Sequence, residues 1–307
     1  MTDRRSTGVH GWLVIDKPPG MTSAAVVGRA RRATCAAKAG HGGTLDPLAT
    51  GVLPIALGEA TKTVGYVVDG RKLYRFTVRW GEQRDTDDAE GAVMATSGVR
   101  PDPERIMAML ARYHGEIDQV PPTYSAVKVA GERAYALARA ARPVELLARR
   151  VTVERMELVE CPDRDHAVFE VEAGKGVYMR ALARDLANDL GTVGHVVALR
   201  RLSVGPFKEQ AAIGLDMLEA IGHSDELDSH LLPVGSALAG IPALTLTEVE
   251  AKRLRNGQAI AVLPVSSRSP LADLSRDAVV CAMARGRPIA LAQIKGGELR
   301  PLRIINH

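Results

Sequence analysis

The chain contains few cysteines and few aromatic residues, and it has no long apolar run. Among 307 residues, cysteine occurs only at Cys35, Cys161 and Cys281, and no two of these form a C-x-x-C pair. Such an odd, widely spaced set argues against a disulfide framework and against a structural zinc site. The apolar run at residues 12–15 is too short for a signal-peptide core, and no stretch is long enough to span a bilayer. We therefore expect a cytoplasmic protein that makes no membrane contact.

Motifs that bind cofactors or activate a serine nucleophile are also missing. The sequence has no G-x-G-x-x-G, no G-x-x-x-x-G-K-[ST] and no His and Cys residues at metal-ligand spacing. The turn at residues 41–43 is similar to the oxyanion-hole turn of some esterases, but no G-x-S-x-G nucleophile elbow accompanies it. We expect neither a cofactor nor a metal. The missing nucleophile elbow argues strongly against an esterase.

Charge is nearly balanced overall but is unevenly distributed. The chain has 40 Lys and Arg residues against 36 Asp and Glu, a net charge of +4. Basic residues gather before residue 40 and recur as the adjacent pair Arg200 and Arg201. Any one of these patches alone is more simply a solvated surface. Together with the loop described next, they favour a footprint on a phosphate backbone.

Residues 40–62 carry the densest functional pattern. The glycines at 40, 42 and 43 permit positive φ and close approach of a ligand. Pro47 biases Asp46 away from the α region and so stiffens the turn. One carboxylate on a stiff turn, beside His41 and Thr44, is the arrangement that a nucleophile or an acid/base catalyst needs. A Gly-rich turn in which Asp46 simply caps the next segment fits the same residues equally well.

Several ordered blocks give this segment a more specific meaning. The blocks are Leu13–Ser23, Gly40–Lys62, Lys72–Arg75, Val120–Lys128, Lys175–Arg180 and Leu199–Leu202. They cover roughly residues 10 to 235 and resemble the bacterial tRNA pseudouridine synthase B family, whose members isomerise uridine 55 in the tRNA T loop.

The resemblance implies an α+β pseudouridine synthase fold. We expect a central, largely antiparallel mixed sheet flanked by helices, in a catalytic domain over residues 1–240 with an RNA-gripping loop at about 121–146. A small β-rich, PUA-like RNA-binding domain is expected over residues 241–307. This second expectation rests on position and on β-like runs at 278–284, 288–294 and 298–305, not on a sharp motif.

Periodicity predicts further elements. Residues 72–80 alternate with period two, so Tyr74, Phe76, Val78 and Trp80 share one face of a strand. Strands are also predicted at 11–16, 149–159 and 166–172, and a loop at 264–277. Helices are predicted from residue 22 or 23 to 36, from 102 to 113 and from 178 to 190, and one ending at 257 after the capping-box pattern of Thr247 and Glu250.

The resemblance assigns three catalytic roles. Asp46 matches the catalytic aspartate of the family, which acts either by attack on C1′ of the ribose or by proton removal to a glycal-like intermediate. Arg180 matches the arginine that pairs with this aspartate; it lies off the leucine stripe of its helix, from which it can point outward into a cleft. An ordinary structural ion pair is the alternative. Tyr74 matches the tyrosine that stacks on the target base and takes the C5 proton, although most tyrosines in such a stripe are core residues.

Other positions are implied to bind substrate. His41 matches a residue that fills the space left by the flipped bases, or it is only a hydrogen-bond partner in its turn. Lys17 and Pro18 shape the floor of the site, and Lys128, Arg133 and Arg139 contact phosphates. The remaining expected substrate-binding residues are Gly42, Gly43, Thr44, Tyr178 and Leu199. Gly42 and Thr44 depart from the Thr and Ala that many relatives carry there, which puts the rigidity of the loop in doubt.

The expected partner is the T stem-loop of tRNA, with no obligate protein partner and a monomeric state. A rival reading is an RNA-binding folding helper in which isomerisation is secondary. An Asp46 variant that binds RNA but cannot isomerise it would distinguish the two readings.

Overall fold

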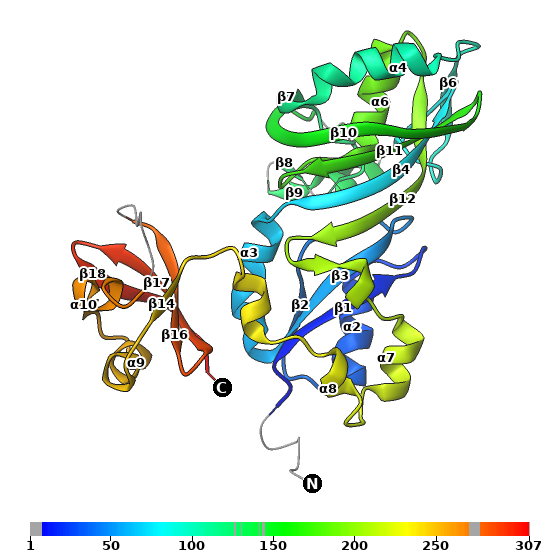
Figure 1. The fold of residues 1–307 in the computed structure, drawn as a ribbon. Coiled ribbons are helices and arrows are strands. Elements are labelled where there is room, and N and C mark those ends of the chain that lie inside the picture. The colour runs from blue at the N-terminus through cyan, green and yellow to red at the C-terminus, as the bar shows by residue number, and fades with distance from the viewer. Residues whose placement is uncertain are drawn as a thin grey trace.

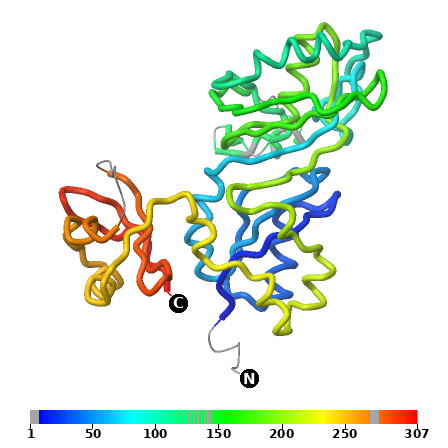
Figure 2. The backbone as a smooth tube through the Cα atoms, in the orientation of Figure 1, coloured from blue at the N-terminus to red at the C-terminus, as the bar shows by residue number. Residues whose placement is uncertain are grey.

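Two β-sheets, one in each of two units, organise the chain (Figure 1). The computed structural model describes residues 8–125, 127–129, 131–140, 142, 145–269 and 277–306. The chain crosses once between the units, near residue 240, along the yellow part of the tube in Figure 2. No helix in these described ranges is both long and apolar enough to cross a membrane.

The first unit holds thirteen strands in its described residues: β1 (Gly11–Lys17), β2 (Ala39–His41), β3 (Thr50–Leu57), β4 (Lys72–Trp80), β5 (Glu82–Arg84), β6 (Val93–Thr96), β7 (Gly115–Gln119), β8 (Lys128–Val129), β9 (Glu132–Arg133), β10 (Arg149–Asp163), β11 (His166–Ala173), β12 (Gly194–Val204) and β13 (Phe207–Lys208). Its α-helices are α2 (Ser23–Ala33), α3 (Val64–Asp69), α4 (Pro103–Leu110), α5 (Ala134–Arg139), α6 (Met179–Asp189), α7 (Leu215–Ile221) and α8 (Leu227–His230). Short 3-10 turns are η1 (Gly58–Thr63), η2 (Ala111–Tyr113), η3 (Glu209–Ala211) and η4 (Val234–Leu238).

The main sheet is mixed and largely antiparallel. Within the described residues its order is β1-β3-β12-β4-β11-β10-β7, with β2 beside β3 and β13 beside β12. Only β12 and β3 pair in parallel; the other pairings in this sheet are antiparallel. Helices α2 and α7 lie at the β1–β3 end and α4 and α6 at the β4–β10 end (Figure 1). The expected fold class is thereby confirmed.

Both faces of this sheet are buried at its β1–β3 end. Leu13 and Ile15 point into a core that also contains Val26 of α2 and Leu182 of α6. The alternate residues of the same strand enter a second core, which extends into the second unit and includes Trp12, Val14, Phe207, Cys281, Leu291 and Ile305. Because β-strand side chains alternate between faces, one apolar strand such as β1 joins the two cores.

The second unit contains a five-stranded sheet in its described residues, in the order β14-β16-β17-β18-β15. Its elements are β14 (Ala243–Thr245), α9 (Glu248–Arg255), β15 (Ile260–Ala261), α10 (Val262–Ser266), β16 (Val279–Ala284), β17 (Arg287–Lys295) and β18 (Glu298–Ile304). The predicted capping box is present, with Thr247 and Glu250 bonded reciprocally at the start of α9. The PUA-like character of this unit and the boundary at residue 240 remain predictions.

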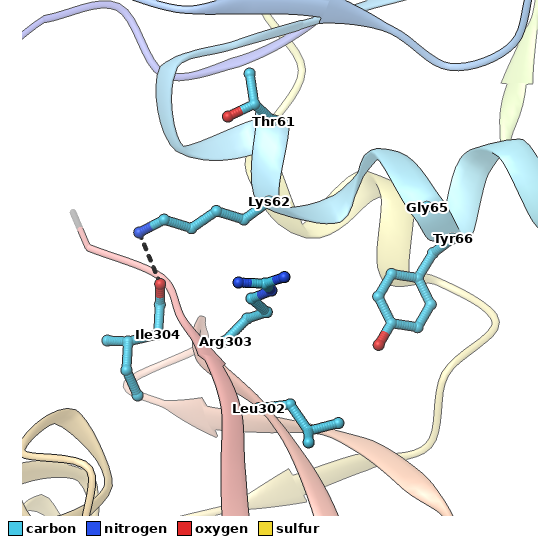
Figure 3. A pocket seen from close by; sticks show the side chains of 7 residues that line it. All are labelled: Thr61, Lys62, Gly65, Tyr66, Leu302, Arg303 and Ile304. Carbon is cyan, nitrogen blue, oxygen red and sulfur yellow. Dashed lines mark hydrogen bonds between the residues drawn. The ribbon is translucent and has the colours of Figure 1, made fainter. Parts of the chain in front are cut away.

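A cleft of about 750 Å³ lies where the two units meet (Figure 3). Lys62 of η1 donates from Nζ to the Ile304 carbonyl at 2.8 Å, and Tyr66 and Arg303 line the cleft. Turn η1 follows the C-terminal end of β3, whereas Asp46 precedes its N-terminal end. An eight-residue strand is about 26 Å long, so this cleft is separate from the surroundings of Asp46.

Most predicted elements are present, and the differences have local causes. β4 spans the predicted residues 72–80, with Phe76, Val78 and Trp80 buried on one face. α2 ends at Ala33 and not at residue 36, because Cys35 takes a positive φ of 50° that terminates the helix. β10 extends to Asp163 through register shifts. α10 (Val262–Ser266) begins before the stretch predicted as a loop, 264–277, and ends inside it; residues 270–276 of that stretch lie outside the described part.

Candidate active site

The turn that carries Asp46 is fixed on both sides by buried side chains. Ser23 accepts from the Leu45 N–H at 2.8 Å and donates to the Leu45 carbonyl at 3.0 Å. The carbonyl of Pro47 accepts from Lys17 Nζ at 3.0 Å and from the Gly20 N–H at 2.8 Å. The flanking backbone therefore cannot shift without breaking buried hydrogen bonds, while the Asp46 side chain keeps 32% of its surface exposed.

Arg180 reaches this carboxylate from the first turn of α6. Its Nε donates to Asp46 Oδ2 at 2.9 Å, while Nη1 and Nη2 donate to the carbonyls of Thr86 and Tyr124 at 2.8 and 2.9 Å. The predicted pairing with Asp46 is thus seen in the geometry. The Arg180 side chain is only 3% exposed, so it does not lie on the open surface but points into the site, where it meets the partly exposed Asp46 carboxylate.

Asp88 is a second carboxylate beside Arg180, and no sequence pattern singles it out. Its Oδ2 lies 3.4 Å from Arg180 Nη1, and its side chain is 5% exposed. Its Oδ1 accepts from Thr86 Oγ1 at 2.6 Å and from the Glu90 N–H at 3.0 Å. Arg180 is therefore shared between a buried aspartate and the more exposed Asp46.

Lys17 lies fully buried beneath the turn. Burial lowers its pKa to about 8, and the nearby Asp46 carboxylate opposes part of that shift. The ammonium donates to the carbonyls of Pro18 and Pro47 at 2.8 and 3.0 Å. This position fits the expected floor of the site, with a positive charge close to Asp46.

Arg201 is buried, in contrast to the surface basic pair that its sequence position suggested. It is 1% exposed and donates to the carbonyls of Val52, Thr44 and Gly43 at 2.8, 3.3 and 3.0 Å. Arg200 points the other way and forms ion pairs with Asp16 and Glu209 at 3.0 and 3.3 Å. Both members of the predicted phosphate patch thus have partners inside the protein.

Tyr74 lies on β4 directly opposite Arg201 of β12. Its side chain is half-buried and packs against the main core. Burial lowers the pKa of Arg201, and the adjacent Tyr74 hydroxyl and the Asp46 carboxylate act against that effect. The Asp46 carboxylate is therefore near the charges of both Arg180 and Arg201, and Tyr74 contacts Arg201 directly.

His41 and Gly42 form the entrance to the turn. The Gly43 N–H donates to His41 Nδ1 at 3.3 Å, so this histidine is a hydrogen-bond partner within its own turn. Burial lowers the His41 pKa, and the nearby Arg201 charge adds to the shift, so the imidazole is neutral at pH 7. A Cβ on Gly42 would lie 2.5 Å from Cγ1 of Val67, so Val67 fills the space that a larger residue would need.

The other expected substrate-binding residues lie at the edges of the site. Tyr178 is the N-cap residue of α6, and its backbone N–H and carbonyl both hydrogen-bond to the Gln119 side chain. Burial raises the pKa of the Tyr178 phenol, and the nearby Asp46 carboxylate adds to the rise. Leu199 is 7% exposed, and its carbonyl accepts from Thr50 Oγ1 at 3.5 Å. The side chains of Lys128, Arg133 and Arg139 lie outside the described part of the structure.

Three residues of this arrangement were missed by sequence reasoning: Ser23, Asp88 and Arg201. Ser23 was read as a possible helix cap, but Thr22 is the N-cap residue of α2 and accepts from Ala25 N–H at 3.2 Å. Ser23 instead bonds to the backbone of Leu45, 22 residues along the chain, and no local sequence pattern indicates a contact over that separation. Among the described residues, no group of three or more His, Cys, Asp and Glu side chains is placed to hold a metal ion.

Comparison with known proteins adds an independent line of information. The family model described as TruB family pseudouridylate synthase (N terminal domain) matches residues 31–179, and that of the tRNA pseudouridylate synthase B C-terminal domain matches residues 180–239. A tRNA pseudouridine synthase B of Rhodospirillum rubrum is 58% identical over 303 residues, covering 99% of this chain and 98% of the relative. One of Gluconacetobacter diazotrophicus is 55% identical, covering 99% and 100%.

Solved structures share the fold. A chain of a Cbf5-Nop10-Gar1 complex superimposes with a TM-score of 0.76 at 25% identity, covering 97% of this chain and 85% of that one. A chain of an H/ACA RNP bound to a substrate RNA containing 2'-deoxyuridine gives a TM-score of 0.74 at 23% identity, covering 97% and 86%. The second likeness concerns the fold alone.

Proposed function

Because the chain belongs to the TruB family of pseudouridylate synthases, we propose that it isomerises uridine 55 in the T loop of tRNA, with Asp46 as its catalytic carboxylate. The observation that carries the proposal is the pairing of Asp46 with Arg180 on a turn whose backbone is held from both sides. Family membership supplies the reaction class, and this geometry supplies the residue.

The reaction begins with extrusion of the target nucleotide, at a cost of a few kcal/mol for unstacking. His41 and Tyr178, at the rim, and Leu199, on β12, are the proposed contacts of the everted nucleotides. The neutral His41 imidazole offers a hydrogen bond or a stacking face without adding charge beside the uracil.

Asp46 then acts at the junction of sugar and base. In one route its carboxylate attacks C1′; in the other it takes a proton from the ribose. In both, the C1′–N1 bond breaks, its electron pair leaves with the uracil, and the uracil turns and bonds to C1′ through C5. As that bond forms, the first route breaks the C1′–O bond and frees the Asp46 carboxylate, and the second returns the proton from Asp46 to the ribose. Nothing is oxidised or hydrolysed. Arg180 and Lys17 supply positive charge beside the Asp46 carboxylate when RNA excludes water from the site.

Tyr74 completes the reaction in this proposal. After C5 has joined C1′, the C5 proton must leave to restore the aromatic uracil, and N1 gains a proton. Tyr74 stands on the central strand β4 with its ring toward the core and its hydroxyl near Arg201. A phenol in this place can accept the C5 proton and pass it to solvent.

The second unit, residues 241–307, is proposed as a PUA-like RNA-binding domain. Its five-stranded sheet packs on the catalytic unit through Cys281, Leu291 and Ile305, which fixes any RNA that it binds relative to the turn at Asp46. The tRNA is the only partner that the proposal requires.

Tritium release from tRNA labelled with [5-³H]uridine tests the proposal. We expect about one equivalent of tritium per tRNA and a pseudouridine at position 55 by chemical mapping. The control is a transcript with cytidine at position 55, which should release none. Equal release from both transcripts would place the modification elsewhere and contradict the proposed target.

A further inference from the structure

Arg201 joins the strand that carries the catalytic turn to the strand that carries Tyr74. β12 lies between β3 and β4 in the main sheet. On one side Arg201 is paired in parallel with Gly51, and on the other it is paired in antiparallel register with Tyr74. A shift of Arg201 would therefore be transmitted to both strands.

Its side chain is wrapped by the turn itself. The guanidinium donates to the carbonyls of Gly43, Thr44 and Val52, which lie before and after Asp46 in sequence. Three donors on one rigid, planar group thus close the turn across its base.

Two glycines make room for this contact. Gly43 has a φ of +128°, and a Cβ there would lie 3.4 Å from Arg201 Nη1. Gly51 has a φ of +95°, and a Cβ there would lie 2.3 Å from the Arg201 carbonyl oxygen. Both positions therefore favour glycine for its backbone conformation, and at Gly51 close approach leaves no space for a side chain.

The burial of this arginine is costly for stability. Among the described residues it forms no ion pair with a carboxylate; its hydrogen bonds go to three backbone carbonyls and to the Tyr74 hydroxyl. An apolar residue would avoid the desolvation of a charge. Such a cost is expected where a site needs fixed geometry more than it needs stability.

We propose that Arg201 is a positioning residue that sets the distance between Asp46 and Tyr74 by clamping the 43–52 turn to β12 opposite Tyr74. The inference rests on the proposed function, because it assigns Arg201 to the same reaction. Arg201 itself need not touch the RNA, since the guanidinium is buried behind the turn.

Arg200 provides a matched control on the same strand. It is the neighbouring residue and also an arginine, but its side chain is 37% exposed, and its guanidinium pairs with Asp16 and Glu209 and not with the carbonyls of the turn. The variants Arg201→Lys and Arg200→Lys thus make the same chemical change on opposite faces of β12.

The experiment measures the single-turnover rate of tritium release at saturating enzyme, together with the tRNA Kd and the thermal unfolding midpoint. We expect Arg201→Lys to lower the rate about 100-fold, as a misplacement of about 1 Å does, with a Kd within about threefold of wild type. Arg200→Lys should keep both values within about threefold.

A double-mutant cycle with Tyr74→Phe separates positioning from a general loss of structure. If Arg201 acts by placing the turn relative to Tyr74, the rate losses of Arg201→Lys and Tyr74→Phe combine to less than their product. Multiplicative losses, a wild-type rate in Arg201→Lys, or failure of Arg201→Lys to fold would each overturn the inference. An inactive wild-type enzyme would instead refute the proposed function, so the two failures are distinguishable.

Discussion

Arg180 Nε lies 2.9 Å from Asp46 Oδ2, although the two residues are 134 positions apart. The same guanidinium is held by the carbonyls of Thr86 and Tyr124, and Asp88 lies 3.4 Å away. Because these other contacts fix the plane of the Arg180 guanidinium, its Nε–H has a single direction, toward Asp46 Oδ2. The arginine therefore determines where the Asp46 carboxylate rests.

Replacing Arg180 should reduce the rate of the chemical step. Arg180→Lys keeps the charge but cannot reproduce four directed contacts, so we expect a loss of about 100- to 1000-fold in kcat, the range found on removing a directed electrostatic contact. Arg180→Met leaves the buried Asp88 without its counter-charge and should also lower the free energy of unfolding by about 3–5 kcal/mol.

Arg184→Lys is the control for this prediction. Arg184 lies one turn further along α6 and pairs with Asp87 at 2.9 Å, not with Asp46. Single-turnover kinetics with urea unfolding of each variant will separate rate from stability. A fully active Arg180→Lys enzyme would show that the pair with Asp46 is only structural.

Removing the Tyr74 hydroxyl should separate stacking from proton transfer. Tyr74→Phe keeps the ring on β4, so the free energy of unfolding should change by no more than about 1 kcal/mol and tRNA should still bind. Pseudouridine formation, followed by chemical mapping, should fall strongly because the C5 proton loses its acceptor. Full product formation by this variant would remove the proton-transfer role and leave stacking open.

Gly42 packs tightly against Val67 of α3, which occupies the space that a larger side chain at position 42 would need. Gly42→Thr places a Cβ 2.5 Å from Val67 Cγ1, so the turn or α3 must move. We expect Gly42→Thr to lose about 1–3 kcal/mol of unfolding free energy, as overpacked cores do, and to slow the reaction. Adding Val67→Ala should recover most of both losses. A Gly42→Thr enzyme with unchanged rate and stability would show that this contact does not fix the turn.

Two buried lysines should make the protein more stable as the pH rises from 8 to 9. Burial lowers the pKa of Lys17 and of Lys72 to about 8. In the unfolded chain each amine keeps its proton to about pH 10.4, so above pH 8 the unfolded state binds more protons and the free energy of unfolding increases with pH. Between pH 8 and pH 9 the free energy of unfolding rises by about 1 kcal/mol per lysine.

Cys281 limits the useful range of that experiment. Burial raises the pKa of its thiol to about 11, so the folded state keeps a proton that the unfolded state loses, and stability falls mainly above pH 9. Urea titrations at pH 8 and 9 should show the rise in wild type and about half of it in Lys72→Met. A flat wild-type profile would mean that both amines remain charged when buried.

Local patterns predicted well those elements whose side chains follow one period. β4 and the leucine face of α6 follow the simple alternation and helical spacing of their sequences, and the capping box at Thr247 is a short-range motif. β3 was not predicted as a strand, because Gly51 and Pro54 are poor strand residues. Pro54 is tolerated there since the parallel ladder with β12 covers only Thr50 and Gly51.

The site residues that were predicted are those that the family resemblance implied. Asp46 and Arg180 come together as expected. Arg201 has the sequence character of an exposed basic residue, and only the three carbonyls that surround it account for its burial. Asp88 lies in an acidic stretch typical of a surface loop, yet its side chain is buried in contact with Arg180 and Thr86. Such contacts depend on tertiary packing, which single-sequence periodicity does not contain.

The most direct test of the account is tritium release by Asp46→Asn, with tRNA binding measured on the same preparation. The amide keeps the size of the side chain and can still meet Arg180, but it can neither attack C1′ nor take a proton. We expect Asp46→Asn to bind tRNA with a Kd near that of wild type and to release no tritium from position 55. Release at the wild-type rate by this variant would contradict the role of Asp46. Binding without release by the wild-type enzyme itself would favour the RNA-folding alternative.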